Sequence, residues 1–326
     1  LHVACLALGI GPGDRLWTSP ITFVATANVA RLCGAEADFV DIDPATALMD
    51  PDRLAAKLAR AERAGRLPKI VAPVHLGGQS CDMAAIGALA ERYGFRVLED
   101  ASHAVGATEA GAPVGACPHS DVAVFSFHPV KIVTTAEGGV ATTRDPDLAE
   151  RMARLRSHGI TRDPALMTHA PDGPWYYQQL ELGLNYRMTE LQAALGGSQL
   201  DRLDAFVARR NTLAERYDAC LAGLPLRPLA RRVGVYSAFH LYVVLVEEPR
   251  HHRAVFDGLR ARGIGVNLHY IPVHLQPYYR RLGFGPGDFP AAEDYYGRAL
   301  SLPLWPGLSE AAQDAVIAAL QAELAP

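Results

Sequence analysis

Residues 121–139, DVAVFSFHPVKIVTTAEGG, contain the stretch that decides the fold. The apolar, β-branched run from Val122 to Phe127 predicts a buried strand. Pro129 has no backbone N–H and ends regular pairing, and Lys131 follows two residues later. A lysine just past the carboxyl end of a core strand can lose solvation and a proton, which makes it a candidate nucleophilic amine. The alternative is an ordinary solvated lysine, so the case depends on its neighbours.

Strands and helices alternate on the N-terminal side of this stretch. We predict strands over 15–19, 37–40, 69–74 and 96–99, and helices over 51–63 and 83–93. Residues 20–28 lead into a further helix that runs through Cys33. This alternation is typical of an α/β fold with a parallel sheet covered by helices on both faces. Ligands of such sheets bind outside the carboxyl ends of the strands.

The predicted strands deliver polar and aromatic groups to that edge. The candidates are Phe23, Asp100, His103, Ser126, His128 and Lys131.

After Asp145 the regular alternation of predicted strands and helices ends. A charged helix over 146–157 precedes an irregular segment over 170–185 that is rich in Pro, Gly, Trp and Tyr, and such long loops are often functional. Thr189 is expected to cap one long helix that ends at Cys220. We then expect strands over 239–246 and 266–269 and helices over 251–263, 294–300 and 309–324. The chain thus divides into a large domain (residues 1–205) and a small α+β domain (residues 206–326).

Composition narrows the function classes. The chain has 326 residues, of which 49% are hydrophobic, and its net charge is −4. The negative net charge gives no overall positive field that would attract nucleic acid, and no apolar run approaches the length of a membrane span. The five cysteines show no CxxC pair, which fits a cytoplasmic protein and argues against a zinc site.

Asp100 and Lys131 together suggest pyridoxal phosphate chemistry. That cofactor needs a lysine to form a Schiff base and a carboxylate to keep its pyridine nitrogen protonated. Each residue also has an ordinary explanation. Asp100 could cap a helix, His103 and Phe23 could be core residues, and Ser126 could bond to backbone.

Several longer motifs resemble one family. LALGIGPGDRLWTSPITFVATANVARLCGAEADFVDID, VLEDASHAVGA, FSFHPVKIVTTAEGGVATT and GLNYRMTELQAALGGSQLDRL look like the DegT/DnrJ/EryC1/StrS sugar aminotransferases. The resemblance covers nearly the whole chain. It implies the aspartate aminotransferase fold (fold type I), with a seven-stranded type of sheet, and a pyridoxal phosphate cofactor.

The resemblance also implies a role for each candidate. Lys131 would bind the cofactor covalently and carry protons, Asp100 would pair with the pyridine nitrogen, and His103 would lie beside the ring. Phe23 would stack on the ring and Ser126 would contact the phosphate. Asn185 would reach the cofactor of a partner subunit, so the enzyme would be a homodimer with shared sites. The sugar nucleotide would be contacted by Arg187, Tyr270, His274 and His128.

Within the family, WYYQQLELGLNYRMTE, HYIPVHLQPYYRRLGF and SLPLWPGLS are most similar to the branch that serves pseudaminic acid biosynthesis. That branch implies transfer of an amino group from L-glutamate to the C4 ketone of a UDP-4-keto-6-deoxy-N-acetylhexosamine. The alternatives are a dTDP- or GDP-4-keto sugar as substrate, or a catalytically impaired scaffold with this fold. Lys131 distinguishes the chain from the family's dehydratases, which have histidine there.

The family places a small-residue, phosphate-binding loop before the position of Leu1, and only Leu1-His2 of that pattern is present. We therefore expect either that the sequence is a fragment of a longer enzyme or that this chain binds its cofactor weakly.

Overall fold

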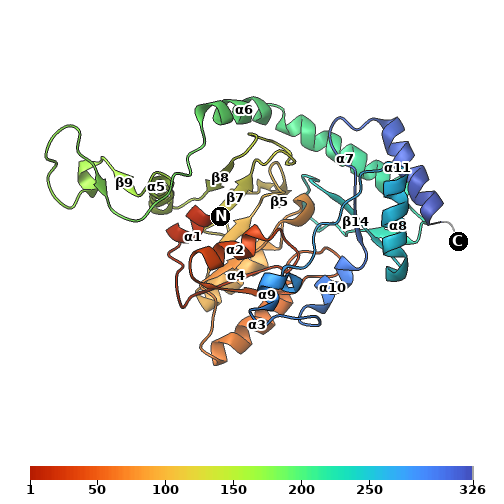
Figure 1. Ribbon diagram of the computed structural model, residues 1–326, viewed down its shortest axis with the longest axis horizontal. Coiled ribbons are helices and arrows are strands. Elements are labelled where there is room, and N and C mark those ends of the chain that lie inside the picture. Colours follow the sequence, from red (N-terminus) through yellow and green to blue (C-terminus); the bar gives the residue numbers. More distant parts are fainter. Residues whose placement is uncertain (325–326) are drawn as a thin grey trace.

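The computed structural model describes residues 1–324, and its centre is a six-stranded sheet (Figure 1). Five neighbouring strands are parallel, and β8 runs antiparallel to β7. The α/β fold is confirmed, with one strand fewer in this sheet of the described chain than the seven that the resemblance implied. In spatial order the strands are β2 (Glu36–Phe39), β1 (Arg15–Thr18), β3 (Ile70–Ala72), β4 (Arg96–Asp100), β7 (Val122–Ser126) and β8 (Gly139–Thr142).

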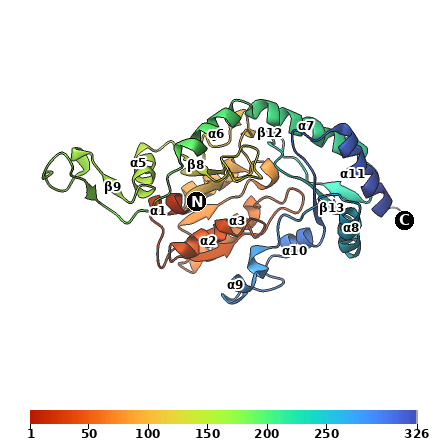
Figure 2. The same ribbon diagram turned by 45° about the horizontal axis from the view of Figure 1, so that its top comes forward.

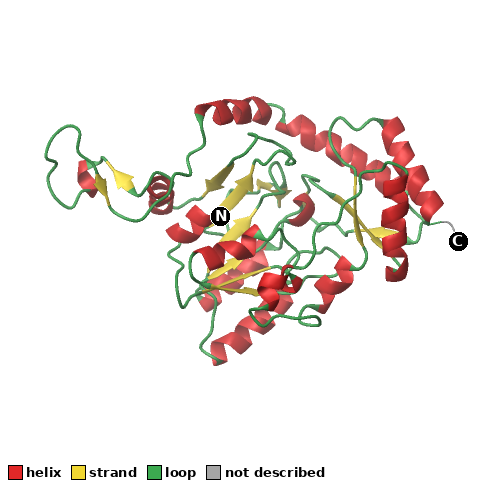
Figure 3. Cartoon of the chain, viewed as in Figure 1, coloured by secondary structure: helices red, strands yellow, loops and turns green. Residues whose placement is uncertain are grey.

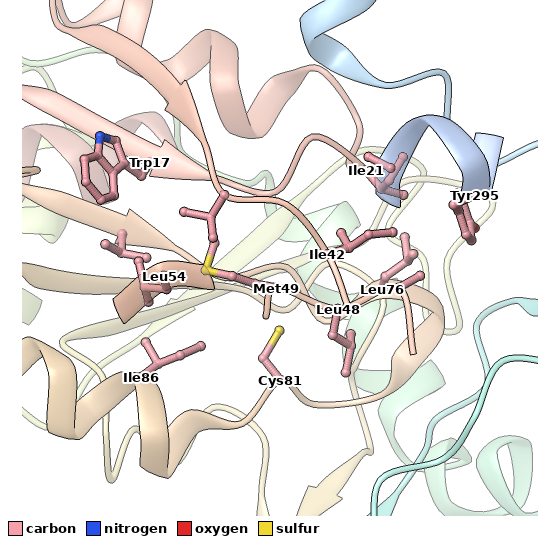
Figure 4. Close-up of a cluster of buried hydrophobic side chains, with 14 of the residues drawn as sticks. Trp17, Ile21, Ile42, Leu48, Met49, Leu54, Leu76, Cys81, Ile86 and Tyr295 are labelled. Atoms are coloured by element: carbon pink, nitrogen blue, oxygen red, sulfur yellow. The ribbon is translucent and has the colours of Figure 1, made fainter. Parts of the chain in front are cut away.

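Helices cover both faces of this sheet because successive strand residues point to opposite sides. Leu16 and Leu98 pack with the buried residues of α1 (His2–Ala7), α2 (Ala25–Leu32) and α5 (Pro146–Leu155). Trp17 and Val97 pack with those of α3 (Pro51–Arg63) and α4 (Met83–Tyr93). Figure 4 shows part of this second cluster, and Figure 3 shows the strands in yellow between helices in red.

Short-range signals set the bounds of these helices. The side chain of Asp50 accepts hydrogen bonds from two amides of the first turn of α3, and Pro51 occupies its first position, where no amide partner is needed. Asp82 caps α4 by accepting a hydrogen bond from the Ala85 amide, and Gly94 ends that helix with a left-handed backbone (φ 74°), which glycine adopts without a Cβ penalty.

A second sheet and three helices form the C-terminal core (Figure 2). The antiparallel strands lie in the order β11, β13, β14, and their apolar residues pack with α7, α8 and α11. The bounds are α7 (Leu203–Cys220), β11 (Leu226–Pro228), β13 (Tyr242–Val246), α8 (Pro249–Ala261), β14 (Ala299–Leu302) and α11 (Glu310–Glu323). The remaining short elements are η1 (Leu76–Gly78), β5 (Thr108–Glu109), β6 (Ala112–Pro113), η2 (Pro164–Leu166), β12 (Val235–Tyr236), η3 (Val273–Leu275), α9 (Pro277–Arg280) and α10 (Pro290–Tyr296).

Three predicted elements were wrong. The long helix from Thr189 is two helices, because α6 (Glu190–Leu200) ends before α7 begins at Leu203; Gly196 and Gly197, poor helix formers, precede the break. The predicted helix over 294–300 is the end of α10 followed by β14, since short apolar runs fit either state. The predicted strand over 266–269 pairs through one bridge, between Asn267 and Ser301.

The segment over 160–179 extends away from the rest of the molecule (Figure 1). It contains the short antiparallel strands β9 (Ile160–Thr161) and β10 (Gln178–Gln179) and otherwise has the irregular character that was predicted. No helix in the described residues combines the length and apolarity that crossing a membrane requires.

Candidate active site

A cavity of about 1430 Å³ lies at the carboxyl ends of β4 and β7. Its lining combines these strand ends with the start of α2 and loops from the C-terminal half of the chain. This is the edge of the sheet at which the sequence predicts the ligand site. Of the predicted site residues, the lining includes Phe23, Asp100, His103, Ser126, His128, Lys131, Arg187 and Tyr270.

Asp100 is the last residue of β4 and is almost fully buried, with an exposed fraction of 4%. Thr26 donates a hydrogen bond from its Oγ1 to Asp100 Oδ2 at 2.5 Å, and the Ser102 amide donates to Oδ1 at 3.1 Å. These bonds fix the carboxylate, and each oxygen keeps a lone pair for a further donor. The Ser102 bond means that Asp100 also caps its own loop. The helix cap expected as the alternative is not found, because residues 101–106 form turns and no helix.

Lys131 lies on the loop after β7, with its amide bonded to the His128 carbonyl at 2.9 Å. The chain has three lysines. Lys57 pairs with Asp38 and Lys69 with Asp14, whereas Lys131 forms no ion pair with any described residue. Burial lowers the pKa of Lys131 to about 8, against the opposing effect of the Asp100 charge. The amine is thus partly neutral near physiological pH, as a nucleophile or proton carrier requires.

Tyr270 and His103 form a hydrogen-bonded pair beside this lysine. His103 Nδ1 accepts from the Gly77 amide at 3.3 Å, so the neutral ring carries its proton on Nε2. Nε2 then donates to the Tyr270 hydroxyl at 3.2 Å, which leaves the phenolic proton available to a ligand. Burial, with the charges of His240 and Lys131, lowers the pKa of His103 well below its usual value, which keeps the ring neutral.

The loop that carries Lys131 is closed by tight backbone packing. Ser126 at the end of β7 pairs with Gly139 at the start of β8. A Cβ on Gly139 would lie 2.6 Å from the Phe125 carbonyl oxygen, so only glycine fits this strand pair. Gly139 in the motif therefore allows the close approach of the two strand backbones.

The other predicted residues differ in position. The ring of Phe23 is 60% exposed and lies 6.1 Å from the ring of Tyr270 between centroids. Asn185 is exposed, pairs with Ser157 through a β-bridge and does not line the cavity of its own chain.

The assignment of His274 to the sugar nucleotide needs correction. His274 is completely buried, hydrogen-bonded to Glu293 at 3.0 Å and packed against Phe39 and Phe289. The sequence shows a histidine in an aromatic loop, but the rings that enclose it come from distant segments. His274 is therefore a core residue in this structure.

Sequence reasoning missed three residues at the cavity. Thr26 contacts Asp100 from α2, and its hydroxyl lies 2.9 Å from that of Thr22, which precedes the helix. His269 lines the cavity beside Tyr270. His240 lies behind His103, with ring centroids 4.4 Å apart, and its buried Nδ1 has no partner among the described atoms. The Thr22–Thr26 spacing was the one readable signal.

The residues present fit pyridoxal phosphate. The donor set contains an amine with a lowered pKa, a fixed carboxylate for a ring nitrogen, an aromatic ring at the mouth and a serine hydroxyl at a strand end. The cavity is larger than the cofactor needs, which leaves room for a second molecule.

Comparisons with known proteins agree with this chemistry. The DegT/DnrJ/EryC1/StrS aminotransferase family model matches residues 1–321. The spore coat polysaccharide biosynthesis protein SpsC of Bacillus subtilis is 41% identical over 98% of this chain and 82% of its own length. Spr1654 from Streptococcus pneumoniae, solved in a PLP form, superposes with a TM-score of 0.86 at 30% identity, over 99% of this chain and 85% of that one.

A further solved structure bears on the substrate. Helicobacter pylori PseC, an aminotransferase involved in the biosynthesis of pseudaminic acid, superposes with a TM-score of 0.87 at 27% identity. The match covers 99% of this chain and 85% of PseC.

Proposed function

Because this chain belongs to the DegT/DnrJ/EryC1/StrS aminotransferase family, we propose that it transfers the amino group of L-glutamate to the C4 ketone of a UDP-4-keto-6-deoxy-N-acetylhexosamine. The observation that carries the proposal is the meeting of Lys131, a lysine without an ion-pair partner among the described residues, with Asp100 in one cavity. A catalytically impaired scaffold would not require Lys131 and Asp100 in the same cavity.

Pyridoxal phosphate is the cofactor of this sugar aminotransferase, and when bound it supplies an electron sink for the carbon that gains or loses a proton. Asp100 would hold the ring nitrogen in its protonated form, and Thr26 keeps that carboxylate in place. Lys131 would attach the cofactor and move the proton at its Nζ. Phe23 would cover the ring, and Ser126 would donate to the phosphate.

Sugar recognition is assigned to the outer part of the cavity. The Tyr270 hydroxyl has a proton to donate, and Arg187 and His128 line the mouth. The three groups suit a ligand with hydroxyls and a diphosphate. The choice of a UDP sugar of the pseudaminic acid type rests on the sequence motifs and is supported by the likeness to PseC.

The proposal includes a homodimer with shared sites. Large apolar side chains of the segment over 175–195 are exposed, which is unusual for a monomer surface. Asn185 lies on this segment, is exposed and does not line its own cavity, which is compatible with a role at a partner's cofactor. The exposed residues are Trp175, Tyr177, Leu180, Leu182, Tyr186, Leu191 and Leu195.

We place the enzyme in the cytoplasm, where the five cysteines, all free thiols in the structure, would remain reduced.

Turnover with a panel of 4-keto sugars tests the substrate assignment. With L-glutamate as donor, the UDP-4-keto-6-deoxy-N-acetylhexosamine should give 2-oxoglutarate and a 4-amino sugar with the highest kcat/KM. A preference for a dTDP- or GDP-4-keto sugar would overturn the UDP assignment and leave the aminotransferase intact. The Lys131→Ala variant is the control for cofactor-dependent turnover.

A mixed-subunit experiment tests the shared site. Lys131→Ala and Asn185→Ala chains are each expected to be impaired as homodimers. If Asn185 serves the partner, co-refolded mixtures regain activity only when one site receives both native residues. Activity that never rises above the sum of the two parents would contradict the shared site.

A further inference from the structure

A second cavity, of about 620 Å³, lies at the opposite end of the sheet from β8, at the edge strand β2. It is an open cavity lined by residues of β1, β2, α2 and α3 and of the loop that follows α9. None of its lining residues lines the candidate active site. Its size is within the range of small-molecule sites.

Positive charge dominates this cavity, although the whole chain is negative (net −4). Five cationic and two acidic side chains line it. Glu36 is shared by Arg15 at 2.9 Å and Arg66 at 3.4 Å, and Asp38 pairs with Lys57 at 2.7 Å. The two carboxylates therefore leave an excess of three positive charges, and such a concave basic surface attracts anions. The full cationic set is Arg15, Arg31, Lys57, Arg60 and Arg66.

Two arginines keep donors for a ligand. Arg60 projects from α3 and forms no ion pair with any residue of the described chain. Arg31 donates to the Ala35 carbonyl at 2.7 Å and to the Tyr278 hydroxyl at 3.3 Å, which uses two of its five N–H groups. Guanidinium groups bind phosphate oxygens in pairs of parallel hydrogen bonds.

The indole N–H of Trp17 is a second, independent indication of a ligand, because it has no hydrogen-bond acceptor among the described atoms. The Trp17 side chain lines the cavity and is only 2% exposed. A buried N–H without an acceptor costs free energy. In Figure 4 the indole nitrogen lies on the side of the ring away from Leu54 and the apolar cluster. Lys57 Nζ lies 4.7 Å from the centroid of the same indole.

We propose that this cavity binds a small phosphate-bearing anion, which accepts hydrogen bonds from Arg60, Arg31 and the Trp17 indole. The charge excess selects an anion, the guanidinium geometry selects phosphate, and the volume allows a ligand up to the size of a nucleotide. The site is separate from the aminotransferase centre and does not depend on the sugar substrate proposed above.

Burial and the neighbouring Arg60 lower the pKa of Lys57, against the effect of Asp38. A bound anion would relieve this repulsion, so the electrostatics agree with the proposal.

Calorimetric titration of the pyridoxal phosphate-loaded enzyme with inorganic pyrophosphate, and separately with AMP, tests the site. Loading fills the position of the cofactor phosphate in the active site, and the Arg60→Glu variant described below distinguishes binding in this cavity from binding where the diphosphate of the sugar nucleotide would lie. Binding of pyrophosphate with similar affinity to AMP would show that phosphate alone is recognised, and tighter binding of AMP would identify a nucleotide; both support the site. Binding of neither probe would overturn it.

Arg60→Glu and Arg63→Glu form a matched pair of variants. Both reverse one charge on α3, but Arg63 does not line the cavity. Arg60→Glu should weaken probe binding by about tenfold or more, because a hydrogen bond between charged groups is lost, and Arg63→Glu should leave it nearly unchanged. Trp17→Phe, which removes the N–H but keeps an aromatic ring, should also weaken binding. Equal effects of the two charge reversals, or unchanged binding in Arg60→Glu, would contradict the proposal.

Discussion

Two carboxylates follow one another at the end of β4 and serve different regions of the molecule. Glu99 and Asp100 are equally buried, with exposed fractions of 3% and 4%, but strand alternation turns them to opposite faces of the sheet. Glu99 accepts from His75 Nε2 at 2.8 Å and from the Ser120 hydroxyl. Burial alone would raise the pKa of Glu99, but His75 and Ser120 outweigh it and hold that pKa below its usual range.

Asp100, in contrast, faces a cavity that also holds a lysine without an ion-pair partner among the described residues. The Glu99 region is closed, because its donors and acceptors are matched within the core. In the Asp100 region, the Lys131 amine and the Asp100 carboxylate line the same cavity but form no ion pair with each other. Burial of an acid alone therefore does not distinguish a structural network from a reactive site. A nearby ionisable group without an ion-pair partner, here Lys131, makes that distinction.

The largest expected effect comes from Lys131→Ala. Removing the amine should lower kcat by about 10²–10⁴-fold from the lost proton transfer alone, while the melting temperature of the cofactor-free protein stays the same or rises, since a buried amine is removed. Lys69→Ala, at an exposed pair with Asp14, is the control and should keep full activity. Comparable loss in both variants would refute the special role of Lys131.

Asp100→Asn should lower activity without lowering stability, and this combination would distinguish the Asp100 region from the Glu99 region. The amide keeps the shape of the side chain but cannot stabilise a protonated ring nitrogen, so kcat should fall by about 10²–10³-fold, the scale seen for a lost electrostatic stabiliser. The free energy of unfolding should change little. Normal turnover in this variant would show that Asp100 only caps its loop.

Glu99→Ala should show the reverse pattern. It leaves His75 without its buried partner, which should lower the free energy of unfolding by about 3 kcal/mol. Activity per folded molecule, measured by active-site titration, should be retained. Denaturant melts of Glu99→Ala beside Asp100→Asn make the comparison direct, and equal destabilisation by both would remove the distinction drawn here.

The sequence carries the information for this site unevenly. The position of Lys131 and Asp100 followed from strand ends in a parallel sheet, a rule that needs only local patterns. The roles of Thr26 and His240 did not, because each contacts a residue far along the chain. The burial of His274 depends on Phe39 and Phe289, and β14 is a strand because β13 offers it an edge. Such long-range packing overrides the local pattern.

Thr26→Val tests the positioning of the Asp100 carboxylate, because it removes the side chain that holds Oδ2 in place. Valine keeps the volume but loses the 2.5 Å hydrogen bond to Asp100 Oδ2. A hydrogen bond to a charged group contributes about 1.5–3 kcal/mol, so kcat should fall by about tenfold or more. Thr22→Val, which touches Thr26 but not Asp100, should have a smaller effect. The prediction fails if the two valine variants are equally active.

The smallest effect is a dependence on pH. Because burial lowers the pKa of Lys131 to about 8, its amine is protonated below that pH and neutral above it. The rate at which cofactor-free protein takes up pyridoxal phosphate should therefore rise with pH and level off above about pH 9, roughly one unit beyond this pKa. A rate that keeps rising towards the ordinary lysine pKa would mean that Lys131 is solvated.

We propose that the cavity around Asp100 is the cofactor site and that Lys131 supplies its amine. Borohydride reduction of the pyridoxal phosphate-loaded protein, followed by peptide mass mapping, tests it most directly, because the chain has only Lys57, Lys69 and Lys131 to label. We expect one label, on the peptide that contains Lys131. A label on Lys57 or Lys69, or no label at all, would contradict it.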